Sequence, residues 1–495
     1  MAGQTENNVP QSLFILIHGL LGSHKHMHSV RDLILQNNKE NSLVLIPCKN
    51  SFFKTFDGIE IVGDRVIKEI KIFLKTRSEK EIKSLRWINF VSYSMGGLIS
   101  RYVIGEMALY LEKRYPMMKF NTFMTFASPH LGVNFFKDGK FPYNVLTTLG
   151  SNILGRSGKQ IFVKDKDGPD SEKLLVKISK GKYLAALKQF KFRIAIANGH
   201  NDRTVAFYSS FITDLGYGCN LEALEEDKIL SNWLKFPQGV VLDVTKKMDT
   251  SERVGKDSSL SFFTKLKLCK ASKYTGKLLL IALFVVFIFP IILFINTIGT
   301  IYSYINVWIH NNQATIRSRF LFFNKDWLSK KLDIDLDEDL DDDEMEHLIK
   351  KISRDGNYDP IVSEEVQDLF VADWELKKGT YHESIKNLTE DKKDALYFRY
   401  FIKKYMSNNI HDKFNNSEGR LPFDESRKEI YENLNNLKWI RVPYKLTGAN
   451  THRAIIARTG LESASLINRK ALEFNISLLM QVCKYSKEDN EIECL

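Results

Sequence analysis

The sequence predicts an α/β fold with a mostly parallel central sheet and helices on both faces. Two observations indicate it. Continuous apolar runs rich in branched residues, typical of strands buried on both faces, lie at 13–17, 42–48, 87–93, 119–130 and 190–198. Between them lie segments with apolar residues at helical spacing, at 59–74 and 96–114. This alternation of strand and helix is typical of parallel sheets.

Length, composition and net charge limit which classes of protein this sequence can belong to. The chain has 495 residues, of which 44% are hydrophobic and 26% charged, enough for one large core or two domains. The net charge of +11 suits an anionic membrane surface, and we expect no nucleic-acid partner. The five cysteines have no regular spacing and are expected to be reduced thiols. The polar start of the chain predicts no secretory signal peptide.

An uncharged apolar segment interrupts this pattern. Residues 278–295 carry no polar side chain, and the apolar character continues more weakly to 309. Lysines at 265, 267, 270, 273 and 277 precede it, and basic residues follow it. Eighteen helical residues rise roughly 27 Å, close to the thickness of a bilayer core. A buried core helix is the alternative, but the basic flanks favour membrane contact.

A charged region follows the apolar segment. The run 332–347 has aspartates at spacings that resemble a calcium loop, but Glu338 stands where the sharp turn needs glycine, so a solvated acidic run is favoured. Further on, 437–446 is predicted to be a strand and 461–485 a helix. We therefore expect four parts: a core at 1–245, a basic-flanked membrane segment at 265–312, a charged, mostly helical insertion at 313–430, and a C-terminal part at 431–495 that completes the core.

Ser94 is the candidate nucleophile. It lies in VSYSMGG, directly after a predicted strand and before a predicted helix. A serine at such a turn is held in strained geometry with its oxygen exposed at the sheet edge, and small neighbours are needed because strand and helix nearly touch. Gly96 and Gly97 meet this need on one side, and Ser92 stands where glycine is usual. The motif alone does not distinguish a nucleophile from a serine that happens to precede two glycines.

A serine nucleophile needs a base and an acid to activate it. In hydrolases built around this turn, the acid and then the histidine follow the serine in the chain. Asp202 follows the strand at 190–198, although an aspartate there could also be an ordinary turn or cap residue. Among the later histidines only His452 lies in a loop just after a predicted strand. Its alternative role is a surface or helix-capping residue.

The turn after the first strand supplies the other expected part of the site. Residues 18–20 read His-Gly-Leu, and the backbone N–H groups of Leu20 and Met95 are the candidate oxyanion hole. Alternating histidines at 24, 26 and 28 suggest a metal, but no acidic residue accompanies them. We assign no metal and expect no cofactor.

Together these segments resemble a known family. FILIHGLLGSHKHM, YSMGGLISRYVIG, TFASPHLGV, FRIAIANGHNDRTV and WIRVPYKLTGANTHRAIIAR are similar to the fungal serine esterase/lipase family of the α/β-hydrolase superfamily, and most to its yeast lipid-droplet phospholipase branch. The resemblance covers roughly 12–215 and 437–458. It implies a triad of Ser94, Asp202 and His452. Ser92-Tyr93 in place of Gly-His, and Ala206 in place of proline, depart from the family pattern.

The triad constrains the apolar segment, which lies between Asp202 and His452. A single membrane crossing would separate these residues, so 278–309 should return to the side it entered from, as a shallow hairpin bending near Pro290 or 296–299. Such a hairpin suits a lipid-droplet monolayer, and also the endoplasmic reticulum membrane, with the catalytic part facing the cytosol. The segment 132–162 could be an amphipathic lid or a plain helical excursion.

The sequence thus predicts a membrane-associated serine lipase whose partners are a phospholipid or acylglycerol substrate and a lipid surface. A phospholipase is favoured, and a monoacylglycerol lipase or protein deacylase is the alternative within the class. A non-catalytic membrane-surface scaffold with a decayed hydrolase fold is the alternative outside it, supported only by the change at Ser92.

Overall fold

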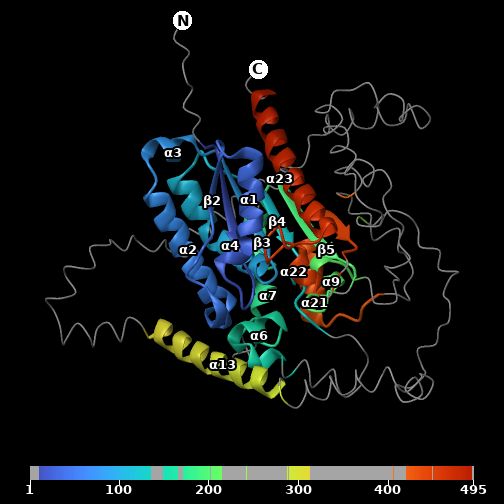
Figure 1. Ribbon diagram of the computed structural model, residues 1–495. Helices are drawn as coiled ribbons and strands as arrows, with labels where there is room; N and C mark the ends of the chain where they lie inside the picture. Colours follow the sequence, from blue (N-terminus) through green and yellow to red (C-terminus); the bar gives the residue numbers. More distant parts are fainter. Residues whose placement is uncertain are drawn as a thin grey trace, which may run out of the picture.

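The central sheet has six parallel strands (Figure 1). The computed structural model describes residues 10–134, 148, 150–165, 171–200, 202–214, 241, 287, 289–312, 405, 420–446, 448 and 450–492. The strands are β1 (Ser12–Ile17), β2 (Ser42–Leu45), β3 (Trp87–Tyr93), β4 (Lys119–Phe126), β5 (Phe192–Asn198) and β6 (Ile440–Tyr444), in the order β2-β1-β3-β4-β5-β6. Every neighbouring pair is parallel, which confirms the predicted sheet.

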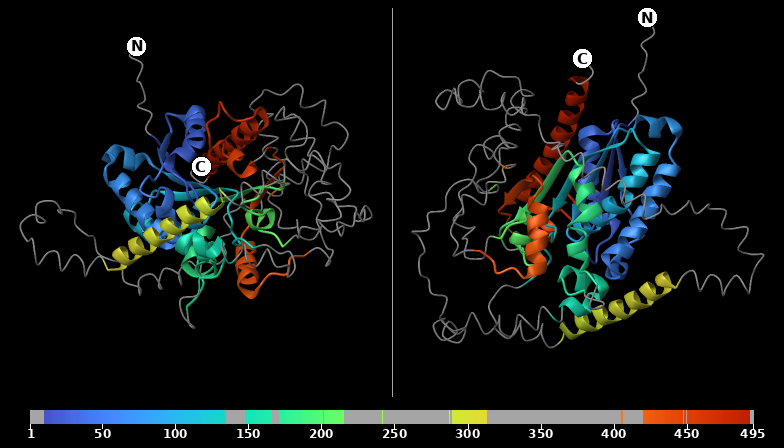
Figure 2. Two further views of the ribbon diagram at one scale, coloured as in Figure 1. Left: turned by 60° about the horizontal axis from the view of Figure 1, so that its bottom comes forward. Right: turned by 180° about the vertical axis from the view of Figure 1, so that it is seen from behind.

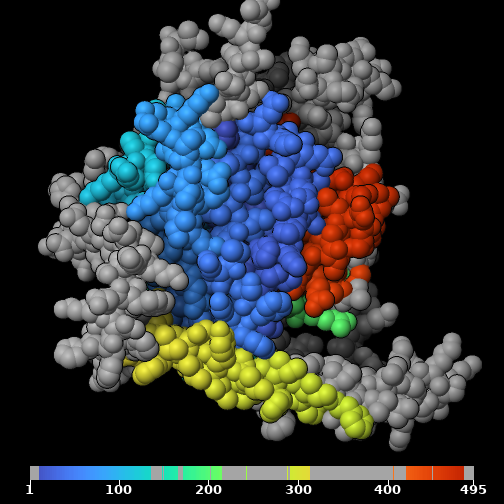
Figure 3. Space-filling model, turned by 60° about the vertical axis from the view of Figure 1, so that its left-hand side comes forward, coloured from blue at the N-terminus to red at the C-terminus, as the bar shows by residue number. Residues whose placement is uncertain are grey.

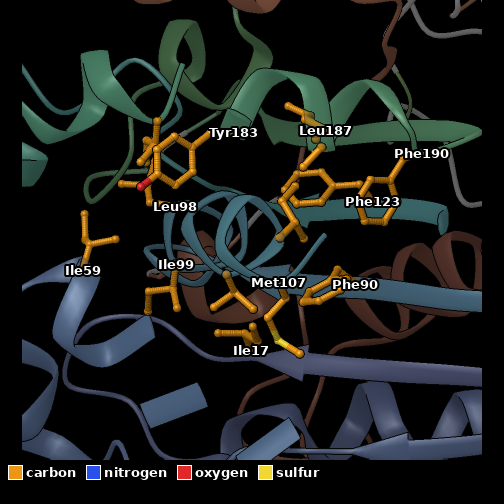
Figure 4. Close-up of a cluster of buried hydrophobic side chains, with 14 of the residues drawn as sticks. Ile17, Ile59, Phe90, Leu98, Ile99, Met107, Phe123, Tyr183, Leu187 and Phe190 are labelled. Atoms are coloured by element: carbon orange, nitrogen blue, oxygen red, sulfur yellow. The ribbon is translucent and has the colours of Figure 1, made fainter. Parts of the chain in front are cut away.

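Both faces of the sheet are buried, as the continuous apolar strands predict. Side chains of β1 alternate between two hydrophobic clusters, with Leu13 and Ile15 in one and Phe14 and Leu16 in the other. Figure 4 shows part of the first cluster, in which Phe90, Phe123 and other strand residues meet side chains from the covering helices. A one-residue slip of β1 would therefore move each of its side chains into the opposite cluster.

Helices cover the two faces in separate groups (Figures 1 and 2). The helices α2 (Ile59–Lys75), α4 (Gly96–Arg114) and α8 (Gly181–Lys188) pack together on one face. On the other face α1 (His28–Asn38) packs against α23 (Leu466–Ile492), which also contacts β4. The predictions of α2, α4 and α23 agree with these helices, whereas α1 was not predicted from the sequence.

Residues near the C-terminus complete the sheet. Strand β6 pairs with β5, although more than two hundred residues separate them in the chain. Just before β6, α21 (Glu425–Asn435) packs against α7 (Leu174–Lys177), and its Arg427 side chain donates to the carbonyls of Val133 and Phe162. The expected boundary at 430–431 thus falls inside a helix that is packed on the core.

The segment expected to be a lid is described in part. Its helix α6 (Gly155–Ile161) packs on η2 (Phe52–Phe56) and caps the start of α2. The hydroxyl of Ser157 accepts from the N–H of Gly58 at 3.0 Å, and the Gln160 side chain accepts from that of Ile59 at 2.7 Å. These buried bonds favour a packed helical excursion for residues 155–161. Residues 135–147 and 149 of the segment lie outside the described residues.

The apolar segment ends in one continuous helix, α13 (Phe289–Asn311). The expected bend at 296–299 is therefore wrong. Gly299 serves instead for close packing, since a Cβ there would lie 2.1 Å from the Phe53 ring of η2. No described helix is long and apolar enough to cross a membrane. Residues 278–286 and 288, and the acidic run 332–347, lie outside the described part of the chain.

Helix α13 lies against the outside of the body (Figure 3). It contacts α6 and η2 at one end of the molecule, whereas α3 (Glu79–Ser84), which leads into the start of β3, lies at the opposite end (Figure 1). Because all strands run parallel, α13 is on the side of the sheet where their carboxyl ends lie.

Candidate active site

Ser94 occupies the turn between β3 and α4 in a left-handed conformation, with φ of 56°. A serine in this region stores about 1–3 kcal/mol of strain, which the surrounding structure must offset. Part of the restraint is visible, because the Ser94 N–H donates to the carbonyl of Phe126 at 2.9 Å. The side chain is 8% exposed. The predicted strained turn is therefore present at this serine.

The glycines around this turn are required by close contacts. A Cβ on Gly96 would lie 2.2 Å from the carbonyl oxygen of Ile17, so β1 and α4 touch through backbone alone. A Cβ on Gly19 would lie 2.6 Å from the Ser94 Cβ. The turn after β1 and the turn after β3 are thus pressed together at the serine.

Ser92, the unusual residue of the motif, fits the crossing between β3 and α4. Its hydroxyl lies 2.5 Å from the hydroxyl of Ser100 on α4, and both side chains are fully buried. The extra oxygen therefore has a partner and displaces no backbone of the turn.

The structure brings the three predicted residues into one chain of hydrogen bonds. His452 Nε2 lies 3.1 Å from Ser94 Oγ, and His452 Nδ1 lies 2.9 Å from Asp202 Oδ2. The side chains of His452 and Asp202 are 8% and 3% exposed. In this arrangement the carboxylate orients the imidazole, whose other nitrogen can accept the serine proton.

Asp202 is held in place by its own turn. Its Oδ1 accepts from the N–H groups of Thr204 and Val205, each at 2.9 Å, which leaves Oδ2 for His452. The turn-capping role considered from the sequence therefore coexists with the contact to the histidine. His452 lies in the short helix α22 (Thr451–Ala454), which Asn450 caps through a bond from the Arg453 N–H.

Tyr93 is a site residue that the sequence reasoning missed. Its ring centroid lies 5.0 Å from that of His452, and its hydroxyl donates to the His452 carbonyl at 3.0 Å. Burial raises the pKa of this phenol well above its usual range, so it remains protonated. Its place directly before Ser94 was the available signal. The side chain fixes the position of α22 against β3.

The candidate oxyanion groups lie at the same place. Within the described part of the chain, the N–H groups of Leu20 and Met95 donate to no protein atom. The next N–H, that of Leu21, donates to Thr55 Oγ1 at 2.9 Å, and Leu21 is itself left-handed with φ of 51°. Thr55 is fully buried in η2 and sits far from the motif, so no sequence signal marked it. It braces the loop that carries the Leu20 N–H.

Histidines 24, 26 and 28 do not form a metal site in the described structure. No group of three or more His, Cys, Asp or Glu side chains there is arranged to hold an ion. The Nδ1 atom of His26 is not available to a metal ion, because it accepts from the Ser23 N–H at 3.2 Å.

Comparison with known proteins agrees with a serine hydrolase site. Residues 7–217 match a serine esterase family. The family is described as "Putative serine esterase (DUF676)". The predicted resemblance to a serine esterase family is confirmed over this part of the chain, and its lipid-droplet phospholipase branch stays a prediction.

Two curated yeast proteins are similar to the same region. "Putative lipase ROG1" of Saccharomyces cerevisiae is 29% identical over 46% of this chain and 32% of its own length. "Putative lipase YDL109C" of the same yeast is 29% identical over 38% of this chain and 27% of its own length. The chain thus spans about a third or less of these relatives.

Solved structures of hydrolases also match the chain. A "putative cell surface hydrolase" of Lactobacillus plantarum has 17% identity over 41% of this chain and 75% of its own, with a TM-score of 0.24. Phospholipase PlaB of Legionella pneumophila has 15% identity over 39% of this chain and 38% of its own, with a TM-score of 0.26. TM-scores this low carry no functional argument.

Proposed function

We propose that this protein is a serine lipase that hydrolyses acyl ester bonds of glycerophospholipids at a lipid surface. The observation that carries the proposal is the hydrogen-bonded series Ser94, His452 and Asp202 at a strained strand-to-helix turn. The match of residues 7–217 to a serine esterase family supports the class of reaction.

The reaction proceeds by acyl transfer. Ser94 Oγ attacks the ester carbonyl carbon while His452 Nε2 takes its proton, and Asp202 stabilises the imidazolium that forms. His452 then gives the proton to the departing alcohol oxygen, which leaves an acyl-enzyme on Ser94. Water attacks this ester with His452 as base, and the fatty acid departs.

The carbonyl oxygen gains negative charge in each transition state. Among the described residues no acceptor binds the N–H groups of Leu20 and Met95, so both can donate to this oxygen. Met95 stands at the start of α4, where the helix dipole favours negative charge. Removing one such donor costs a serine hydrolase about 10²–10³ in kcat.

Helix α13 supports action at a lipid surface, because its polar face is turned toward the body and its apolar face is exposed. A helix on the surface of a globular protein usually has the opposite arrangement. The face toward the body is small and polar: Thr300 Oγ1 donates to the Ile153 carbonyl at 2.8 Å, and Ser303 is 1% exposed. The outward face is apolar and aromatic, with exposed fractions of 42–67%. Its members are Ile291, Phe294, Ile295, Ile298, Ile301, Tyr302, Tyr304, Ile305, Trp308 and Ile309.

An apolar row of this length is more than isolated surface residues account for. Aromatic side chains favour the membrane interface, and the lysines that precede the segment in the sequence favour anionic lipids. We propose that α13 lies in the outer layer of a lipid-droplet surface, or of the cytosolic leaflet of the endoplasmic reticulum, with the catalytic part in the cytosol.

The nucleophile is tested by labelling with a fluorophosphonate in the presence of lipid vesicles. We expect the wild type to label and Ser94→Ala not to label, with ester hydrolysis reduced at least 10³-fold. Ser92→Ala serves as a matched control that should still label. A wild type that folds but does not label would favour the non-catalytic scaffold instead.

The substrate is tested on phospholipid, monoacylglycerol and acylated-peptide substrates of equal acyl length. We expect the highest kcat/KM on the phospholipid. A higher value on monoacylglycerol or on the peptide would replace the phospholipase assignment with one of those activities, while the serine mechanism would stand.

A further inference from the structure

The short helix η2 contacts both the oxyanion loop, residues 18–22, and the inner face of α13. We infer that α13 positions the oxyanion loop through η2, with Gly299 and Phe53 as the positioning residues. The inference rests on the proposed serine lipase. It gives α13 a role in the reaction that is separate from its contact with lipid.

Two hydrogen bonds join the oxyanion loop to η2. The Leu21 N–H donates to Thr55 Oγ1 at 2.9 Å. In the opposite direction, the Phe52 N–H donates to the Gly22 carbonyl at 2.9 Å. The Thr55 hydroxyl gives its own hydrogen to the Phe52 carbonyl at 2.5 Å, so its oxygen is left to accept from Leu21. A displacement of η2 therefore displaces the loop that carries the Leu20 N–H.

Both sides of this junction hold strained backbone. Leu21 and Phe52 are each left-handed, with φ of 51°. A residue other than glycine keeps this conformation only where the surrounding structure restrains it. The Phe52 side chain is 63% exposed, so its own packing supplies little of that restraint. The rest has to come from the elements packed on η2.

Helix α13 is one of these elements. A Cβ on Gly299 would lie 2.1 Å from the Phe53 ring, so this ring fits closely against the helix backbone. The Phe53 ring packs edge-on against the fully buried Phe56, with ring centroids 5.5 Å apart. Directly after η2, the fully buried carboxylate of Asp57 accepts from Asn306 Nδ2 at 3.4 Å. Helix α13 thus contacts η2 at its middle and at its end.

The position of the oxyanion loop matters for the rate because the Leu20 N–H must point to where the oxyanion forms. A misplacement of about 1 Å, caused far from the reacting atoms, can cost roughly 10²-fold in rate. The bond to the oxyanion is made in the transition state and not in the bound substrate. A displaced η2 should therefore lower kcat and leave KM unchanged.

The test is Gly299→Ala in the full-length protein, measured on soluble p-nitrophenyl butyrate without lipid. Alanine favours a helix over glycine, so any loss comes from the added methyl group against Phe53. We expect kcat to fall at least about fivefold with KM unchanged. Each kcat is expressed per serine labelled to completion by a fluorophosphonate, so unfolded molecules do not count. Ile298→Ala, at the neighbouring exposed position, is the matched control and should change neither constant.

Two double variants test whether the effect passes through η2. Phe53→Leu makes room for the methyl group, so Gly299→Ala with Phe53→Leu should recover at least about threefold in kcat over Gly299→Ala alone. Thr55→Val removes the bond from the Leu21 N–H itself. Adding Gly299→Ala to Thr55→Val should therefore lower kcat by less than about twofold further.

An unchanged kcat in Gly299→Ala would overturn the inference. Losses that multiply in the double variant with Thr55→Val would also overturn it, because α13 would then act by a route other than the Leu21 bond. If Gly299→Ala does not fold, Asn306→Leu removes the bond to Asp57 and should lower kcat at least about threefold. An unchanged kcat in that variant would overturn the inference equally.

Failure of this inference is distinguishable from failure of the proposed function. If the positioning role alone is wrong, the wild type still labels at Ser94 and cleaves the ester, and Gly299→Ala does so at the same rate. If the serine lipase itself is wrong, the wild type neither labels nor cleaves the ester.

Discussion

At the scale of single residues, the site depends on how closely the turn after β1 and the turn after β3 approach each other. Gly19 and Gly96 remove side chains where β1, β3 and α4 meet, and Ser94 takes up a strained conformation there. Ser92 and Thr55 do not touch the reacting atoms. The Ser92 hydroxyl binds that of Ser100, and the Thr55 hydroxyl accepts from the Leu21 N–H. Both hydroxyls can be tested without touching the triad.

Ser92→Gly should restore the more usual residue of the motif. We expect kcat/KM to stay within threefold of wild type, because Ser92 points toward Ser100 and not toward the reacting atoms. The free energy of unfolding should fall by about 1–2 kcal/mol, since Ser100 is left buried without its partner. Urea unfolding and ester hydrolysis measure the two effects. An activity loss above tenfold would contradict this role of Ser92.

Thr55→Val should weaken the oxyanion loop without removing a reacting group. The valine keeps the shape of threonine but cannot accept from the Leu21 N–H. We expect kcat to fall roughly tenfold with KM unchanged. The reason is that the neighbouring Leu20 N–H donates to the oxyanion in the transition state, so a less firmly held loop raises the energy of that state. Thr55→Ser keeps the acceptor and should restore most of kcat. Equal losses in both variants would point to packing alone.

At the scale of elements, α13 differs from every other helix described here. The covering helices of the sheet bury apolar faces, whereas α13 turns its small and polar face toward η2 and α6 and leaves the apolar face outward. Asn306 Nδ2 lies 3.4 Å from the buried carboxylate of Asp57, which Arg65 also binds at 2.5 Å. Docking through polar contacts leaves the apolar face free for lipid.

Replacing Ile301, Ile305 and Trp308 together by Asp should abolish binding to the lipid surface. Burial of each apolar side chain is worth about 1.5–3 kcal/mol, so the partition onto anionic phospholipid vesicles should fall well beyond tenfold. Sedimentation with the vesicles measures it. Hydrolysis of a soluble short-chain ester should not change, because none of these residues contacts the triad.

Met117→Asp is the matched control for this experiment. Met117 is 60% exposed and precedes β4, so it lies at the opposite edge of the sheet. Its replacement should leave vesicle binding unchanged. Unaltered binding of the triple variant would assign the lipid contact to another part of the chain.

At the scale of the whole molecule, histidines whose pKa is lowered in the folded state limit acid stability. Burial lowers the pKa of His18, His26, His28 and His130, that of His26 to about 4. In the unfolded chain each imidazole has a pKa near ~6.5. The unfolded state therefore binds more protons than the folded state between these values. Stability is present above about pH 6.5 and is lost as the pH falls toward 4.

Urea unfolding from pH 8 to pH 4 should show this loss. Burial raises the pKa of Asp57 and Asp64, which works in the opposite direction as their carboxylates take up protons in the folded state. The histidine contribution is isolated by His130→Gln, which should reduce the slope of stability against pH between 6.5 and 4. An identical slope in the variant and the wild type would show that His130 does not contribute.

Much of this arrangement could be predicted from the sequence, because it rests on local patterns. The six strands, the helices α2 and α4, and the turn at Ser94 follow from apolar runs, helical spacing and small residues. Chain order after the turn then selected Asp202 and His452. The helix α1 was missed because its polar residues obscure the apolar stripe formed by Val30, Leu33 and Ile34.

What the sequence determined by itself is the type and order of the elements, since strand and helix periodicity are properties of short stretches of chain. Tertiary structure decided what meets across long separations. It brings His452 to a serine 358 positions away, places the Thr55 hydroxyl under Leu21, and directs the polar face of α13 inward. The physical reason is that these contacts form only when distant elements pack against one another. The periodicity of a short stretch of chain depends on that stretch alone and does not specify which elements pack together.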